Sequence, residues 1–189
     1  MRSCLSLPFA LALVALSPAA AHAEKLPRPS VDYAAEGSLM FGKADHPGTM
    51  RHSGGKMRLD TEVEGLPSSV YIDLTARTAT VVTERMGQKI AMHIDPERAA
   101  AAASLLDEDA KRVGEATIAG ETCSDYEFET AKGRAMRACM TSDGIVLRTR
   151  DVTRNRILWQ ASRVTRAAQR PELFVLPADA IPLQIPKLR

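Results

Sequence analysis

Residues 56–94 read KMRLDTEVEGLPSSVYIDLTARTATVVTERMGQKIAMHI, and this stretch decides the fold class. Its first part, 56–63, alternates apolar and polar side chains, which is typical of a β-strand with one face in water. Further strands are predicted at 70–74, 78–84 and 89–94, because each segment is short, rich in apolar and β-branched residues, and bounded by turn residues. The short connections predict antiparallel pairing between neighbours.

The same alternation continues on both sides of this meander. Upstream, Tyr33, Leu39 and Phe41 share one face of a first predicted strand. Breaks are expected at 45–48 and at 65–68, where glycine and proline occur together. A second meander is predicted downstream, with strands at 115–118, 122–129, 135–141, 145–153 and 156–165. Asp143-Gly144, between two of these strands, is a strong hairpin signal.

One helix is expected between the two meanders. Asp95 suits the N-cap, Pro96 suits the first helical position, and Glu97 suits the positive end of the helix dipole. Alanines at 99–103 continue the helix, which is expected to fray near Val113. Because its middle is almost pure alanine, this helix could cover the concave face of a sheet without filling a cavity.

The chain begins with the three zones of a signal peptide. Arg2 precedes an apolar run over 5–16, and Ala21-His22-Ala23 is a small-x-small cleavage pattern. We therefore predict cleavage after Ala23 and export across the inner membrane into the periplasm. No later stretch is apolar enough to span a bilayer, so an integral membrane protein is not expected. Residues 24–189 are predicted to be one domain, with 171–189 as a proline-rich C-terminal cap.

Export would leave two cysteines, Cys123 and Cys139, and an oxidising compartment favours a disulfide between them. The alternatives are a redox pair or a metal site. A redox pair is normally Cys-x-x-Cys, and no histidine lies near these cysteines in the sequence. The structural disulfide is therefore the favoured interpretation.

A strand register follows if Cys123 lies opposite Cys139 in a hairpin. Asp125 then faces Arg137, on the face that carries the disulfide. The next hairpin, around 154–155, fits tight pairing less well, so a bulge or shifted register is expected there. The arginines predicted to cluster on the convex face, either as a solvated flank or as a contact for an anionic headgroup or partner, are Arg137, Arg148 and Arg150.

Composition and motifs argue against several functions. The formal net charge is +2 in 189 residues, which is too balanced for the basic footprint that nucleic-acid binding needs. The sequence contains no Gly-x-Ser-x-Gly, Walker A or His-Glu-x-x-His motif. We therefore expect no enzymatic activity and no cofactor.

A group of methionines and histidines lies at 40–57. Soft and borderline ligands of this kind can bind copper, which makes a site at Met50, His46 and His52 the metal-binding alternative. The competing interpretation is a loop with surface histidines beside strands whose methionines lie in the core. We favour the latter and expect no metal. The group also includes Met40 and Met57.

The order of motifs resembles the LolA-like superfamily of periplasmic outer-membrane lipoprotein carriers, in particular its small exported branch. The resemblance covers nearly all of the chain after the signal peptide. It implies an incomplete antiparallel β-barrel whose apolar concave face is covered by helices, and in the carriers that cavity holds the acyl chains of lipoproteins. The motifs that carry it are, in order, GKMRL at 55–59, YIDL at 71–74, IAGETC at 118–123, TSDGI at 141–145 and LFVLP at 173–177.

The chain departs from the carriers at its N-terminus. They begin with a long helix, whereas Pro27 and Pro29 forbid a helix in the short segment before the first strand here. The expected fold is therefore mainly β (α+β): an incomplete antiparallel β-barrel, or strongly curved sheet, with one Ala-rich helix over its concave face.

The leading functional prediction is a periplasmic, non-catalytic binding protein or carrier for a lipid or lipidated protein in a half-barrel cavity. One alternative is an envelope protein-interaction or stress module with a filled core, and the other is the copper-binding protein. The residues predicted to form the apolar ligand-binding face are Leu39, Phe41, Met57, Leu59, Ile72, Leu74, Met92, Tyr126, Phe128, Met136, Met140 and Leu147.

Overall fold

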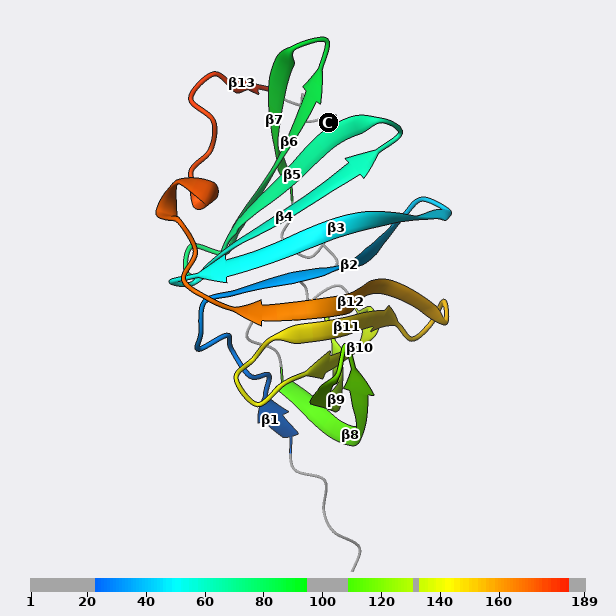
Figure 1. The fold of residues 1–189 in the computed structure, drawn as a ribbon. Helices are drawn as coiled ribbons and strands as arrows, with labels where there is room; N and C mark the ends of the chain where they lie inside the picture. The colour runs from blue at the N-terminus through cyan, green and yellow to red at the C-terminus, as the bar shows by residue number, and fades with distance from the viewer. Residues whose placement is uncertain (1–22, 95–108, 131–132, 184–189) are drawn as a thin grey trace, which may run out of the picture.

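The computed structural model describes residues 23–94, 109–130 and 133–183. They form one 13-stranded sheet with the order β1-β8-β9-β10-β11-β12-β2-β3-β4-β5-β6-β7-β13 (Figure 1). Neighbouring strands are antiparallel except β13, which runs parallel to β7. The strands are β1 (Ala23–Lys25), β2 (Tyr33–Phe41), β3 (Ala44–Ser53), β4 (Lys56–Val63), β5 (Leu66–Asp73), β6 (Thr78–Arg85), β7 (Gln88–Ile94), β8 (Asp109–Ile118), β9 (Glu121–Glu129), β10 (Ala135–Met140), β11 (Val146–Asp151), β12 (Arg156–Arg166) and β13 (Ile181–Pro182).

The sheet consists of two meanders placed side by side. Strands β2 to β7 follow one another in the chain and in the sheet, and so do β8 to β12. The pairing of β12 with β2 joins the two meanders into one sheet. The edge strands β1 and β13 lie at opposite ends of the molecule and do not pair with each other, so the sheet is open (Figure 1). The expectation of a mainly β fold is confirmed.

The α+β fold class, with a helix over the concave face, was wrong. Among the described residues the helical element is the short 3-10 turn η3 (Pro171–Phe174). The start of the expected helix, at 95–108, lies outside the described residues, and its expected end at Val113 lies within β8. Strand β8 pairs with β9 on both sides of Val113, at Arg112 and at Gly114, so the chain is extended there and Val113 itself lies in a bulge between the two paired residues.

Two expected breaks also proved to be strand. The glycine-proline stretch at 45–48 lies in β3, and most of 65–68 lies in β5. Strands β4 and β5 are joined by a two-residue turn in which Glu64 and Gly65 both have positive φ, at 53° and 77°. Such a turn matches the twist of antiparallel strands, and pairing therefore continues directly to Leu66.

The core lies mainly beneath the second meander and its junction with the first. Trp159 of β12 is fully buried, and its indole N–H donates to the Val146 carbonyl oxygen at 3.1 Å. This bond satisfies the one polar group of the largest core side chain. Other fully or almost fully buried apolar residues are Tyr33, Met50, Met57, Met136, Met140, Ile145 and Leu147.

The predicted register of the β9–β10 hairpin was wrong by two residues. Cys139 pairs with Asp125 instead of Cys123, because the hairpin closes with the Thr130 N–H donating to the Arg134 carbonyl oxygen. A shift of two residues keeps every side chain on its predicted face. The expected irregularity before the 154–155 turn is confirmed, since the β11–β12 register shifts between Thr149 and Arg150.

The C-terminal part of the described chain packs on the first meander. Arg58 of β4 donates to the Leu173 carbonyl oxygen in η3 at 3.0 Å, and its guanidinium lies 5.1 Å from the ring centre of Tyr71. Further on, Lys89 of β7 pairs with Asp179 at 2.9 Å, just before β13 joins the β7 edge. The hydrogen bond from Lys89 lowers the pKa of Asp179.

Candidate functional site

A groove of about 500 Å³ lies along the first meander. Its central row is formed by Leu59, Val70, Val81 and Met92, which are paired directly across β4, β5, β6 and β7. Directly paired residues point to the same face of a sheet, so alternation in four strands lines up one apolar stripe. Leu59 is buried, whereas the other three side chains remain partly exposed to the groove.

The rim of the groove is also apolar. Leu39 and Phe41 contribute from β2, Leu66 from β5 and Ile94 from the end of β7. Phe41 is 58% exposed, an unusually large aromatic surface to leave in water. The groove is thus largely apolar, with lining residues from β2, β4, β5, β6 and β7.

Hydroxyl groups form a second row across the groove. Thr61, Ser68 and Thr83 are paired across β4, β5 and β6. The Thr61 hydroxyl donates to the Pro47 carbonyl oxygen at 2.9 Å, and the hydroxyls of Ser68 and Thr83 lie 3.3 Å apart. These groups are satisfied within the protein, and no lysine or arginine is among the described residues that line the groove. The groove therefore suits an apolar occupant better than an anionic one.

The predicted ligand-binding face divides into two parts. Four of its residues line the groove, namely Leu39, Phe41, Leu59 and Met92. The others pack within the core or against it: Met57, Ile72, Leu74, Tyr126, Phe128, Met136, Met140 and Leu147. The alternating pattern reports which side chains share a face but not whether that face is covered. The sequence-based set missed Val70 and Val81, and the signal that could have found them is the antiparallel pairing of neighbouring strands, which places Val70 opposite Leu59 and Val81 opposite Val70.

The predicted metal ligands do not converge. His52 is buried, with Nδ1 2.8 Å from the Val31 carbonyl oxygen and Nε2 accepting from the Gly55 N–H at 3.3 Å. His46 lies six residues away on the same strand, roughly 20 Å along β3. Among the described residues, no group of three or more His, Cys, Asp or Glu side chains is arranged to hold a metal ion.

Met50 and Met57 belong to the core, whereas Met40 is partly buried and lines the groove. Met50 is fully buried, and its Sδ accepts from the Tyr33 hydroxyl at 3.5 Å. The Tyr33 ring stacks on His52 with their centres 5.7 Å apart. Burial, together with the nearby Asp143 carboxylate, raises the pKa of Tyr33. Both ring nitrogens of His52 and the sulfur of Met50 thus have hydrogen-bond partners within the protein.

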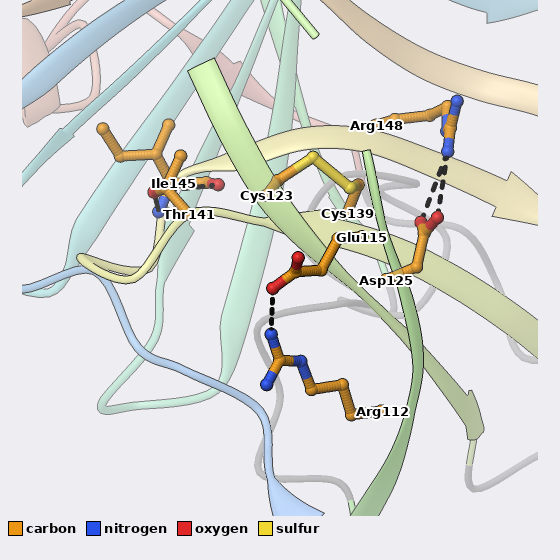
Figure 2. The surroundings of a disulfide bond; sticks show 8 residues. All are labelled: Arg112, Glu115, Cys123, Asp125, Cys139, Thr141, Ile145 and Arg148. Atoms are coloured by element: carbon orange, nitrogen blue, oxygen red, sulfur yellow. Dashed lines mark hydrogen bonds and ion pairs between the residues drawn. A yellow bond between two sulfur atoms is a disulfide. The ribbon is translucent and has the colours of Figure 1, made fainter. Parts of the chain in front are cut away.

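A disulfide joins Cys123 of β9 to Cys139 of β10, with their Cα atoms 5.4 Å apart (Figure 2). Both cysteines are almost completely buried. Beside them, Arg148 of β11 pairs with Asp125 at 3.3 Å, as Figure 2 shows. Arg137 pairs with Glu127 instead of the predicted Asp125, which follows from the two-residue shift in register.

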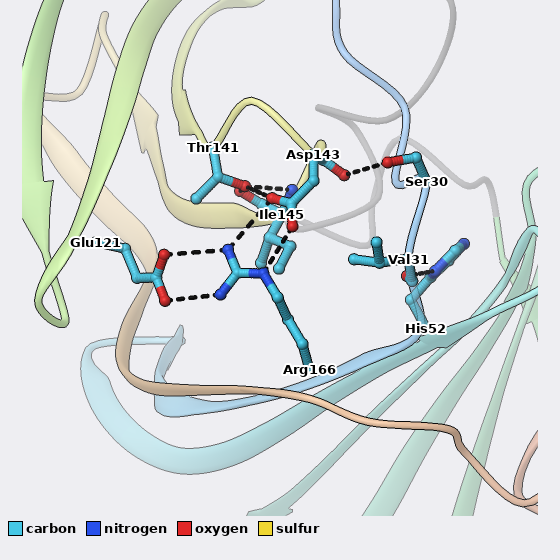
Figure 3. A network of polar contacts seen from close by, with 8 residues as sticks. All are labelled: Ser30, Val31, His52, Glu121, Thr141, Asp143, Ile145 and Arg166. Carbon is cyan, nitrogen blue, oxygen red and sulfur yellow. Dashed lines mark hydrogen bonds and ion pairs between the residues drawn. The ribbon is translucent and has the colours of Figure 1, made fainter.

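An ion-pair cluster ties the end of β12 to two hairpin turns (Figure 3). Arg166 makes two contacts with Glu121, at 2.7 and 3.0 Å, and two with Asp143, at 2.7 and 3.3 Å. The hydrogen bond from Arg166 holds the pKa of Asp143 below its ordinary value. Ser30 also donates its backbone N–H to the Asp143 carbonyl oxygen at 3.0 Å. The cluster therefore fixes the segment before β2 against the second meander.

No protein-family model matches this sequence, and no curated protein matches it. Among solved structures, PNGF-II is 11% identical, with a TM-score of 0.52 over 81% of this chain and 30% of that one. MucB in the Pseudomonas aeruginosa MucA/MucB complex is 12% identical, with a TM-score of 0.49 over 82% of this chain and 59% of that one. A crystal structure of MucB is 13% identical, with a TM-score of 0.44 over 79% and 58%.

The present chain thus spans less than a third of PNGF-II and less than two thirds of MucB. At this level of identity, the likeness to PNGF-II concerns the fold alone. Within the described residues, no helix has the length and apolar character required to cross a bilayer.

Proposed function

We propose that this protein is an exported, non-catalytic binding protein or carrier that holds a lipid, or the acyl chain of a lipidated protein, in the groove of the first meander. The observation that carries the proposal is the row Leu59, Val70, Val81 and Met92 at the bottom of an open groove of about 500 Å³. This volume lies within the roughly 300–1,000 Å³ typical of small-molecule sites.

The physical argument is the cost of leaving this surface in water. Apolar area removed from water contributes about 25 cal/mol per Å², and an acyl chain laid along the row would remove it without leaving polar groups unpaired. The hydroxyl row already has internal partners. Among the described residues that line the groove, Glu64 is the ionisable one, and its carboxylate disfavours an anionic headgroup inside.

Other observations support the proposed location. The predicted signal peptide directs the chain across the inner membrane, and the buried Cys123–Cys139 disulfide suits an oxidising compartment such as the periplasm. The resemblance of the sequence motifs to LolA-like carriers points to the same compartment and ligand class. The open groove favours a carrier over an interaction module with a filled core.

The test uses the mature protein and N-phenyl-1-naphthylamine, a neutral apolar dye that fluoresces when removed from water. We expect saturable dye binding that palmitate displaces. Val81→Trp fills the middle of the groove, because Val81 lies between Val70 and Met92. It should weaken dye binding at least about tenfold. The matched control is Val113→Trp on exposed β8, which should leave the affinity unchanged.

Thermal denaturation should confirm that both variants fold. Native mass spectrometry of gently purified protein is expected to show a lipid adduct that Val81→Trp reduces. A wild-type protein that binds neither dye nor lipid, or equal binding by Val81→Trp, would refute the proposal.

A further inference from the structure

Two arginines stand directly opposite each other on the face of the sheet that points away from the groove. Arg137 of β10 pairs in register with Arg150 of β11. The groove face passes through Leu39, Trp159, Thr149 and Ala138, which are paired in succession across β2, β12, β11 and β10. Since Arg137 and Arg150 are adjacent in sequence to Ala138 and Thr149, they project from the opposite face.

A pocket of about 190 Å³ lies at this arginine pair. Val152 and Asn155, from the turn between β11 and β12, complete its lining. Ile157, paired with Arg150 across β11 and β12, is 39% exposed beside it, as is Val152. The pocket therefore combines two guanidinium groups, one amide and an apolar border.

The charges at the pocket do not balance. Arg137 is held by Glu127, with its Nε 3.1 Å from Oε1 and a second contact from its terminal nitrogen. Arg150 donates to the side-chain oxygen of Asn155, which carries no charge. Within the described part of the chain, the next arginine, Arg148, has its own carboxylate in Asp125. The two guanidinium groups are thus accompanied by one carboxylate, that of Glu127, which leaves one net positive charge at the pocket.

Like charges directly opposite each other in a sheet repel, and an anion between them removes that cost. Each guanidinium presents five N–H donors in a planar fork, and one contact to Asn155 leaves donors of Arg150 available. A carboxylate has two coplanar oxygens and suits one fork. A tetrahedral oxyanion presents oxygens in several directions and can accept from two forks that approach from neighbouring strands.

The geometry points to a binding site for a phosphate group, free or as a lipid headgroup, between Arg137 and Arg150. This site is independent of the proposed function. A ligand whose acyl chain occupies the groove cannot place its headgroup here, because the two sites lie on opposite faces of the sheet.

The test titrates the mature protein with inorganic phosphate at low ionic strength and follows backbone amide shifts by NMR. We expect saturable shifts centred on β10 and β11 that weaken as salt is added. Arg150→Gln should weaken phosphate binding at least about tenfold. Arg150 has no carboxylate partner among the described residues, so this change should leave the melting temperature equal or higher. The control is Arg85→Gln, at an exposed position on β6, six strands from β11, with unchanged binding expected.

A second measurement separates the two sources of phosphate. Flotation with phosphatidylglycerol vesicles, compared with phosphatidylcholine vesicles, reports binding to an anionic lipid headgroup. Loss of both phosphate and vesicle binding in Arg150→Gln supports the site with a lipid headgroup as its natural ligand. If Arg150→Gln loses phosphate binding and the wild type does not bind vesicles, the result supports the site with free phosphate as its natural ligand. No saturable phosphate binding by the wild type, or equal binding by Arg150→Gln, would overturn the inference.

Discussion

Gly37 of β2 packs directly on the backbone of Gln160 in β12. A Cβ atom at residue 37 would lie 2.2 Å from the Gln160 carbonyl oxygen and 2.9 Å from the Ala161 Cα. The contact is at the junction of the two meanders, where the β12–β2 register shifts between Ala161 and Arg163. The two halves of the sheet can therefore join in this geometry only if residue 37 has no side chain.

Gly37→Ala is predicted to destabilise the protein by about 3 kcal/mol or more, because the backbone of β12 would have to move away from β2. Urea denaturation measures the change. Gly114→Ala in β8 is the control, since a Cβ there meets nothing within 4 Å. We expect that control to be neutral or slightly stabilising. Equal stability of Gly37→Ala and the wild type would show that the junction tolerates a side chain.

Arg166→Gln is predicted to reduce stability in a pH-dependent way. The pKa of Asp143 is lowered in the folded state by its hydrogen bond to Arg166, so the pair stabilises the protein above the unfolded-state pKa of about 3.9. That contribution disappears as pH falls through the lower folded-state pKa. We expect a loss of roughly 1 kcal/mol at pH 7, modest because Arg166 is partly exposed, and a progressively smaller loss as the pH falls below about 4.

Denaturation series from pH 2 to pH 7 measure this difference. Arg163→Gln, at an exposed position on the same strand, is the control and should show no such trend. A difference between Arg166→Gln and the wild type that stays constant with pH would contradict the assignment.

Replacing both Cys123 and Cys139 with alanine is predicted to cost about 3 kcal/mol. Their disulfide closes a loop between residues 16 apart in sequence, and opening the loop frees the unfolded chain. Denaturation with and without dithiothreitol tests this. The wild type under reducing conditions should approach the double variant, and the double variant should not respond to the reductant. A wild-type protein equally stable in both conditions would contradict the prediction.

His52→Ala is predicted to destabilise the protein by about 2–4 kcal/mol, because it opens a cavity and leaves the Val31 carbonyl and the Gly55 N–H without their ring partner. His46→Ala should cost less than about 1 kcal/mol. Thermal and chemical denaturation compare the two variants. Similar losses for both would contradict the structural role assigned to His52.

The local sequence pattern was sufficient to locate those strands in which apolar and polar residues alternate strictly. The segment 56–63 coincides with β4, and the Asp143-Gly144 signal lies in the turn between β10 and β11. The local pattern failed to locate strands where pairing with a neighbouring strand overrides the conformational preference of the residues. Pro47 lies within β3 opposite Ser38, and Val113 belongs to β8 because the residues on both sides of it pair with β9. Propensity is a weak signal when a neighbouring strand satisfies the backbone.

The candidate site likewise has a part that the sequence pattern predicts and a part that only strand pairing decides. Alternation in the sequence places Leu59 and Met136 on apolar strand faces, but one lines a groove and the other is sealed in the core. Both lie on the same face of the sheet, and which part of that face is covered depends on how β12 meets β2 at Gly37. The arginine pair likewise depends on the register of β10 with β11, which brings Arg150 opposite Arg137.

By itself, the sequence determined that the chain is mainly β, which side chains share a strand face, and that Cys123 and Cys139 could pair. Each of these follows from interactions between near neighbours or from simple alternation. Only the tertiary structure decided that the sheet stays open, that one part of the apolar face is buried while another part forms a groove, and that two arginines share a pocket. These features depend on contacts between strands distant in sequence, whose geometry is set by backbone approach and register.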